Sequence, residues 1–100
     1  MPRKARKDLE IGFFHVMVQG IKKEKIFYNN KCKEKYIYLM KFFKEKQKID
    51  IISFCVMENH VHIIVYTKNI NELTTFMRKL NTTYAINYNK EEKRVGYVFR

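Results

Sequence analysis

Two histidines, His60 and His62, have the residue type and the spacing of a metal-binding pair. They fall in a run of β-forming residues, and side chains two apart in a strand point to the same face. Neutral imidazole is a common ligand of divalent metals, and a strand beside a tight turn holds both rings with little entropic cost on binding. Asn59 precedes the pair, and its amide can fix the turn or the neighbouring ring. The pair is a candidate metal site, although the His-x-His spacing alone also fits two structural histidines.

The third histidine and the two cysteines carry weaker signals. A lone strand histidine is more often hydrogen-bonded core than metal ligand, so we expect a structural role for His15. Cys32 and Cys55 are isolated, which predicts buried thiols in a reducing compartment rather than disulfides. Cys55 could join His60 and His62 in a zinc site, but no fourth ligand is apparent.

The balance of charge indicates a polyanionic partner. Lys and Arg number 21 against 10 Asp and Glu, which gives a net charge of +11. Nucleic acid fits better than a membrane, because the charges are spread along the chain without a strongly amphipathic helix rich in Trp and Leu. A merely solvated, lysine-rich surface is the alternative. The candidate phosphate contacts are Arg3, Lys4, Arg6 and Lys7 in a basic amino-terminal arm, and Arg78, Lys79, Lys90, Lys93 and Arg94 further along the chain.

The sequence does not predict export or membrane insertion. Asp8 and Glu10 stand where a signal peptide needs an apolar run, and the apolar stretch at residues 51–57 is too short to span a bilayer. We therefore expect a cytoplasmic chain. With 100 residues, no internal repeat and no low-complexity linker, residues 1–100 are expected to form a single domain.

The elements that must position these side chains follow from the spacing of apolar residues. Residues 12–20 alternate between two apolar faces and are predicted to form a strand that is buried on both. Residues 30–47 carry apolar side chains at helical spacing among many lysines, which is typical of an amphipathic helix. Residues 49–56 and 60–66 are β-rich runs joined by three residues, which predicts an antiparallel hairpin.

A second helix is predicted after the hairpin, with Asn71 as its N-cap. Its apolar stripe comprises Leu73, Phe76, Met77, Leu80, Tyr84 and Tyr88. The whole order predicts an α+β domain with a ferredoxin-like antiparallel sheet and two amphipathic helices on one face. Such a fold closes with a fourth strand, and the sequence stops at Arg100 just after the short apolar run 97–99. The last strand is therefore expected to be short or missing, so that the domain is either short or truncated there.

Several motifs in order resemble one family. Residues 55–64 (CVMENHVHII) are similar to the Met-Pro-Asn-His-x-His signature of the single-tyrosine HUH transposases, in particular the REP-associated tyrosine transposases. Residues 14–20 (FHVMVQG) resemble the opening Tyr-His-Val…Arg-Gly of that family. Residues 77–89 resemble its helix with Leu-x-x-Ser-Tyr-x-x-x-Phe-Asn, and residues 96–100 the start of its Gly-x-Leu-Phe-Gln-x-Arg-Tyr motif.

The resemblance implies a DNA transposase that binds single-stranded or hairpin DNA. In the mechanism it implies, His60 and His62 hold Mg²⁺ or Mn²⁺ at the scissile phosphate, and a tyrosine hydroxyl attacks phosphorus to form a 5′-phosphotyrosine link. Two positions depart from the family pattern, since Glu58 replaces the usual Pro and Gln19 replaces Arg. Relatives occur as monomers and as homodimers that share active sites.

The nucleophile is the weak point of this interpretation. Tyr84 and Tyr88 are the candidates within the chain, but a phenol with a pKa near 10 attacks poorly unless a metal or a base lies close. Both also lie on the apolar stripe of the second helix, which favours a role in the aromatic core. In the family the tyrosine comes from a helix beyond the last motif, so we expect that the true nucleophile is absent and that catalysis by this chain is in doubt.

The competing class of function is a nucleic-acid-binding module without catalysis. Residues 94–99 (RVGYVF) faintly resemble the aromatic strand with which RNA-recognition domains stack bases. The spacing differs, and such a module would have no use for a histidine pair. Replacing His60 and His62 by Ala should leave the affinity of such a module unchanged.

Overall fold

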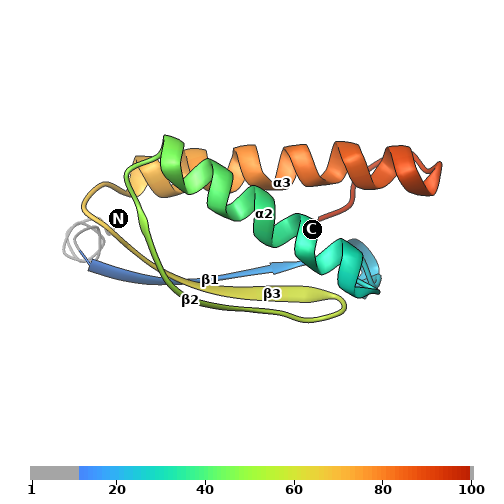
Figure 1. Cartoon of the computed structure of the whole chain (residues 1–100), viewed down its shortest axis with the longest axis horizontal. Coiled ribbons are helices and arrows are strands. Elements are labelled where there is room, and N and C mark those ends of the chain that lie inside the picture. Colours follow the sequence, from blue (N-terminus) through green and yellow to red (C-terminus); the bar gives the residue numbers. More distant parts are fainter. Residues whose placement is uncertain (1–11, 100) are drawn as a thin grey trace.

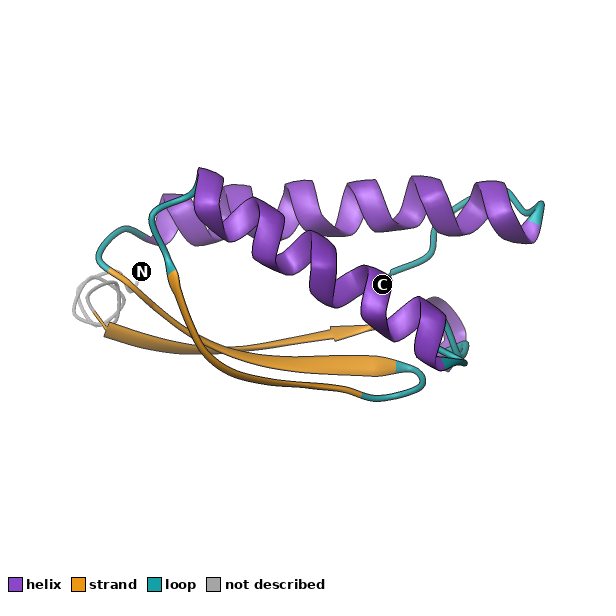
Figure 2. Ribbon diagram, viewed as in Figure 1, coloured by secondary structure: helices purple, strands orange, loops and turns teal. Residues whose placement is uncertain are grey.

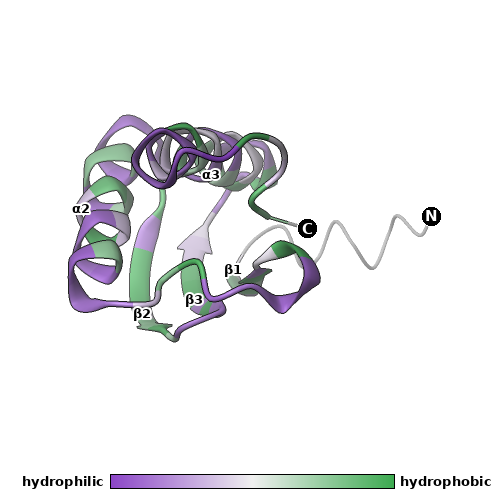
Figure 3. Ribbon diagram, turned by 90° about the vertical axis from the view of Figure 1, so that its right-hand side faces the viewer, coloured by the Kyte–Doolittle hydropathy of each residue, from purple (hydrophilic) through white to green (hydrophobic). Residues whose placement is uncertain are grey.

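The computed structural model describes residues 12–99, which form a three-stranded sheet and two long helices (Figure 1). In chain order the elements are β1 (Gly12–Gln19), the short 3₁₀ helix η1 (Ile21–Lys23), α2 (Asn30–Lys46), β2 (Asp50–Val56), β3 (His60–Thr67) and α3 (Ile70–Glu92). The sheet is antiparallel, with β3 between β1 and β2. Both helices cover the same face of it (Figures 2 and 3). The predicted ferredoxin-like α+β fold is confirmed.

The central strand β3 shows why one face of the sheet is covered. Its side chains alternate, and Val61, Ile63 and Val65 are fully buried beneath the helices. They meet Phe76 and Leu80, which lie one helical turn apart on α3 and are also fully buried. The other face of β3 carries His60, His62, Ile64 and Tyr66, all partly or largely exposed to solvent. The core therefore lies between the sheet and the helices.

The first strand departs from its prediction. Residues 12–20 were predicted to be buried on both faces, but Phe13 and Met17 are 66% and 56% exposed, whereas Val18 is buried. The alternation of β1 thus follows a sheet with a single covered face. The prediction was wrong because both helices lie on one side, and none of the elements described here covers the other.

The predicted hairpin is confirmed, and the tight connection between β2 and β3 is closed by a hydrogen bond from Met57 N to His60 O of 2.8 Å. The helix predicted at residues 30–47 is confirmed as α2, with Asn29 as its N-cap. The predicted N-cap of α3 is wrong by two positions. Asn69 is the cap, because its side-chain oxygen accepts a hydrogen bond from Asn71 N at 2.9 Å. Asn71 itself is already inside the helix.

The end of the described chain returns to β1. Phe99 forms an isolated antiparallel bridge with Gly20, and Ile21 N donates a hydrogen bond of 2.8 Å to Val98 O. Gly20 is needed at this corner, because a Cβ atom there would lie only 2.6 Å from Glu24 O. Val98 is buried, so the segment that was expected to begin a fourth strand closes the core beside β1.

No helix within residues 12–99 is long and apolar enough to cross a membrane.

Candidate metal-binding site

Three imidazoles gather on the open face of the sheet. His60 and His62 come from β3, and their ring centroids are 4.9 Å apart with the ring planes nearly perpendicular. His15 comes from β1 and stacks on His62 with a centroid distance of 5.1 Å. None of the three is buried. The sequence placed His60 and His62 side by side on one face, and the structure places them so.

The start of β3 is fixed by the chain around it, which determines where His60 lies. Gly20 N donates a hydrogen bond of 3.0 Å to Asn59 O, and Phe27 N donates one of 2.8 Å to Glu58 O. Both donors lie after β1, so the hairpin turn is tied to the segment that leads to α2. Because the turn is held from outside the hairpin, the rings beside it have a defined backbone position.

Asn59 favours one tautomer of the neutral imidazole of His60. Its Oδ1 atom lies 2.7 Å from His60 Nδ1. An amide oxygen can only accept, so Nδ1 of a neutral His60 carries the proton. The free lone pair of His60 is then on Nε2. A metal ion binds a neutral imidazole through this unprotonated nitrogen.

His15 differs from its prediction. We expected a hydrogen-bonded core histidine, but His15 lies on the exposed face, and its Nε2 atom is 2.9 Å from His62 Nδ1. His15 alternates in step with Phe13 and Met17, so it shares their exposed face.

Cys55 is also on this face, which bears on the zinc alternative. It pairs directly with His62 across β2 and β3, so the two side chains point to the same side of the sheet. Cys55 is exposed, contrary to the prediction of a buried thiol. Within residues 12–99, however, no three or more His, Cys, Asp or Glu side chains are arranged to hold a metal ion by themselves. The geometry does not supply the closed tetrahedral ligand set of a structural zinc site.

The donor set fits a different kind of site. Two partly exposed imidazoles, His60 and His62, would leave several coordination positions to water and to the oxygens of a ligand. Cations that act on phosphates are commonly bound in this open manner, with few protein ligands. The residues present therefore fit an open divalent site that is completed by a phosphate.

Tyr84 lies in the core on the covered side of the sheet, away from the histidines. It is 1% exposed, packs against Phe27 and Tyr36, and its hydroxyl donates a hydrogen bond of 2.6 Å to Ile26 O. Burial raises the pKa of Tyr84 well above its ordinary value, so its hydroxyl resists deprotonation. The structure thus does not bring Tyr84 together with the histidine pair.

Tyr88 is one turn further along α3 and is likewise separate from the histidines. Its ring stacks on Tyr84 at 5.9 Å, and the guanidinium of Arg94 lies over it at 5.6 Å from the ring centroid. Burial also raises the pKa of Tyr88. Of the described tyrosines, Tyr66 shares the histidine face, but it follows His62 by four residues, roughly 13 Å along a strand.

The predicted phosphate contacts fall into several groups. Arg3, Lys4, Arg6 and Lys7 lie outside the described residues. Lys79 donates a hydrogen bond of 3.3 Å to Gln47 Oε1. Arg94 is held within the protein, 3.3 Å from a Glu24 carboxylate oxygen and 2.7 Å from Asn89 Oδ1. The remaining candidates, Arg78, Lys90 and Lys93, are exposed on or just after α3.

Two further lysines lie closer to the histidine pair and were not singled out from the sequence. Lys25 and Lys33 line a hollow of about 480 Å³ together with the hairpin turn and His60. Lys25 also lies 3.6 Å from a carboxylate oxygen of Glu58. No local sequence pattern marks these lysines, because Lys25 before α2 and Lys33 in its first turn reach His60 only through the packing of this part of the chain against the hairpin turn.

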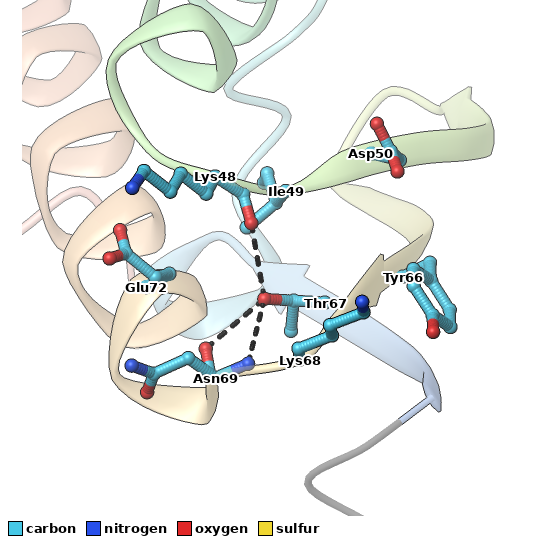
Figure 4. Close-up of a pocket in the computed structure, with 8 residues that line it drawn as sticks. All are labelled: Lys48, Ile49, Asp50, Tyr66, Thr67, Lys68, Asn69 and Glu72. Carbon is cyan, nitrogen blue, oxygen red and sulfur yellow. Dashed lines mark hydrogen bonds between the residues drawn. The ribbon is translucent and has the colours of Figure 1, made fainter.

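A second hollow, of about 460 Å³, lies at the opposite end of β3 (Figure 4). Thr67 is buried there, and its hydroxyl donates to Lys48 O at 3.2 Å and accepts from Asn69 N at 3.1 Å. These bonds join the start of β2 to the start of α3. The hollow contains neither histidine of the pair and is separate from the candidate site.

The structure defines an α+β domain in which two helices cover one face of an antiparallel sheet and paired histidines lie on its open face. The family described as "Transposase IS200 like" matches residues 12–98, and the chain belongs to this family. The resemblance read from the sequence motifs is thereby confirmed.

Solved structures show the same fold. One is described as "Structure of the REP associates tyrosine transposase bound to a REP hairpin", and it superimposes with a TM-score of 0.70 at 10% sequence identity. The match covers 89% of this chain and 51% of the other, so this chain spans about half the length of that protein. A search of curated proteins gave no match.

Proposed function

We propose that this chain binds single-stranded or hairpin DNA and presents a phosphodiester to a divalent cation at His60 and His62, as part of strand cleavage and rejoining through a phosphotyrosine link. The observation that carries the proposal is the placement of both imidazoles on the open face of β3 in a member of the IS200-like transposase family. The net charge of +11 supports a polyanionic ligand.

The protein's own residues prepare the site for this task. Asn59 holds His60 Nδ1 and leaves Nε2 as the donor atom, while the backbone bonds to the turn keep the ring in place. A Mg²⁺ or Mn²⁺ ion bound by His60 and His62 would supply Lewis-acid stabilisation of the charge that develops on a phosphate oxygen. Lys25 and Lys33 beside His60 are suited to hold the neighbouring phosphates.

The proposal of DNA as the ligand is supported by the family and by the net positive charge of the chain. The related solved protein was bound to a REP hairpin, and we extend a hairpin or single-stranded ligand to this chain. The attacking tyrosine is not assigned to Tyr84 or Tyr88, because both lie on the covered side of the sheet and burial raises the pKa of each. The nucleophile is left to the experiment.

The test measures binding and chemistry with one ligand. A labelled hairpin oligonucleotide with single-stranded flanks is titrated with the protein in Mn²⁺ and in EDTA. We expect tighter binding in Mn²⁺, and we expect His60→Ala and His62→Ala to abolish that gain while leaving the binding in EDTA nearly unchanged. Cys55→Ser is the matched control on the same face, and we expect it to keep the gain because Cys55 is not a ligand in an open two-imidazole site.

Covalent chemistry is followed in the same mixtures on denaturing gels. If this chain carries the nucleophile, an adduct forms in Mn²⁺ that His60→Ala removes, and mass spectrometry locates it at a tyrosine other than Tyr84 or Tyr88. Metal-dependent binding without an adduct means that the nucleophile is absent from this chain, as the sequence leads us to expect. Binding without metal dependence and without any adduct would overturn the proposal and leave a non-catalytic nucleic-acid-binding module. Retention of zinc at one ion per chain that depends on Cys55 would favour the zinc alternative instead.

A further inference from the structure

His15 makes a contact that neither the family match nor the histidine pair accounts for. It lies on β1, where its direct partner across the sheet is Ile64, and His62 faces Met17 instead. His15 therefore reaches His62 diagonally, with Nε2 at 2.9 Å from Nδ1 and the two rings 24° from parallel. The diagonal neighbour is within reach of a long or aromatic side chain in an antiparallel pair.

The contact constrains the chemistry of His62. In a hydrogen bond between two imidazoles, one nitrogen donates and the other accepts, so His15 Nε2 and His62 Nδ1 are both engaged by it. When His62 Nδ1 donates this bond and His15 Nε2 accepts it, the lone pair of His62 Nε2 remains to bind a cation. The stacked ring of His15 also limits rotation of the His62 ring, together with the neighbouring ring of His60.

Each histidine of the pair thus has its Nδ1 atom engaged by a neighbouring side chain. Asn59 engages Nδ1 of His60, and His15 engages Nδ1 of His62. We propose that His15 is a positioning residue that fixes the ring of His62 so that Nε2 is presented to the divalent cation. The inference rests on the proposed function, because it assigns His15 a role at the metal site proposed there.

Direct ligation by His15 is the competing role, and the geometry disfavours it. The Nε2 atom of His15 is already used by the bond to His62, and within residues 12–99 no three candidate ligands are arranged around one point. A ligand role would require this bond to break on metal binding, whereas a positioning role requires it to persist.

The experiment compares three variants of the whole chain. His15→Phe keeps an aromatic ring but cannot form the hydrogen bond, and His15→Gln restores a side chain that can donate or accept. Met17→Ala is the control, because Met17 lies on the same strand and face and is the direct partner of His62. Its side chain cannot donate a hydrogen bond to His62. Circular dichroism checks that each variant is folded.

The first readout needs no metal. Nitrogen NMR of the histidine side chains reports which nitrogen of His62 carries the proton and whether the ring is held in one tautomer. We expect His15→Phe to change the His62 signals, and His15→Gln and Met17→Ala to leave them close to those of the unsubstituted protein. Unchanged His62 signals in His15→Phe would overturn the inference. If His15→Phe does not fold, His15→Ala serves in its place.

The second readout is the affinity for Mn²⁺, measured from the electron paramagnetic resonance signal of the free ion. Loss of a hydrogen-bonding partner of a metal ligand typically weakens metal binding about 10- to 100-fold, and we expect a loss in that range for His15→Phe. His15→Gln should recover most of the affinity. Equal weakening in His15→Phe and His15→Gln, with NMR showing that the bond to His62 breaks when metal binds, would make His15 a ligand and overturn the positioning role.

The failures of the two proposals are distinguishable. If the unsubstituted protein does not bind Mn²⁺, the proposed function fails and the role of His15 fails with it. If Mn²⁺ binds normally and His15→Phe binds it equally well, the proposed function stands and only the role of His15 is overturned.

Discussion

His62, a candidate metal ligand, and Tyr84, a candidate nucleophile, lie on opposite sides of one sheet. His62 is on the open face beside His15 and His60, whereas the hydroxyl of Tyr84 is enclosed by the core and bonded to Ile26 O. At the scale of the residue, the side of the sheet decides whether a side chain can meet a large charged ligand. The buried setting of Tyr84 also raises its pKa, which bears on the stability of the fold.

Tyr84 should make the fold sensitive to alkali. Burial raises the pKa of Tyr84 in the folded chain, while in the unfolded chain it is near 10. The stability that the neutral hydroxyl contributes is therefore fully present below about pH 10 and is lost as the pH rises further, since the unfolded chain then releases the proton more readily. We expect the urea midpoint to fall above about pH 10, and to fall less steeply in Tyr84→Phe.

Tyr84→Phe should also lower the free energy of unfolding at neutral pH, and this measurement serves as the control. Removing the hydroxyl leaves the buried carbonyl of Ile26 without this donor, which should cost about 1–3 kcal/mol. An alkaline slope in Tyr84→Phe that equals that of the unsubstituted protein would show that another group causes the loss of stability.

Much of the candidate site could be predicted at this scale, and the rest could not for a definite reason. The shared face of His60 and His62 follows from the two-residue period of a strand. The contact between His15 and His62 depends on the register of β1 against β3, which no local pattern contains. Lys25 reaches the hollow beside His60 through a tertiary contact that is equally invisible in the sequence.

At the scale of the element, sequence patterns located helices and strands well and their ends less well. The start of α3 is the clearest case, because both Asn69 and Asn71 are good N-cap residues. The choice between them depends on where the chain leaves β3. Thr67 accepts a hydrogen bond from Asn69 N, which turns the chain so that the helix begins at Ile70.

These two asparagines offer a matched pair of substitutions. Asn69→Ala removes the side-chain oxygen that accepts from Asn71 N and should lower the free energy of unfolding by about 1 kcal/mol. Asn71→Ala replaces an exposed residue inside the helix by the best helix former and should be neutral or slightly stabilising. Urea denaturation measures both. A larger loss for Asn71→Ala would mean that the helix begins at the later position.

The burial of β1 was mispredicted because composition alone does not say how many layers cover a sheet. Phe13 and Met17 are apolar enough for a core, yet they lie on the open face. An apolar strand is expected to be buried on both faces only when helices lie on both sides. In this fold α2 and α3 lie on the same side of the sheet (Figure 3).

At the scale of the whole molecule, the excess of positive charge should appear in the salt dependence of DNA binding. Charge alone does not identify the contacts, because some basic residues are engaged within the protein. Arg78 is exposed on α3, while Arg94 is held by Glu24 and Asn89 with its side chain only 25% exposed. The two arginines were equal candidates from the sequence, and the structure separates them.

Replacing each arginine by Ala tests this separation. We expect Arg78→Ala to reduce the slope of log Kd against log salt by about 1, as one lost phosphate contact would. Arg94→Ala should leave the slope unchanged and lower the free energy of unfolding by about 1–3 kcal/mol, because its bonds to Glu24 and Asn89 are lost. Slopes are measured by fluorescence anisotropy. The assignment is contradicted if Arg94→Ala changes the slope and Arg78→Ala does not.

The bridge between Gly20 and Phe99 also sets an order of events during synthesis. Phe99 touches Phe27 and Tyr36, so the aromatic cluster cannot be completed until nearly all of the described chain has left the ribosome. Bringing such distant segments together carries the loop-closure cost of a high contact order, which slows folding. The hairpin of β2 and β3, which carries both histidines of the pair, needs no such closure and can form while α3 is still being translated.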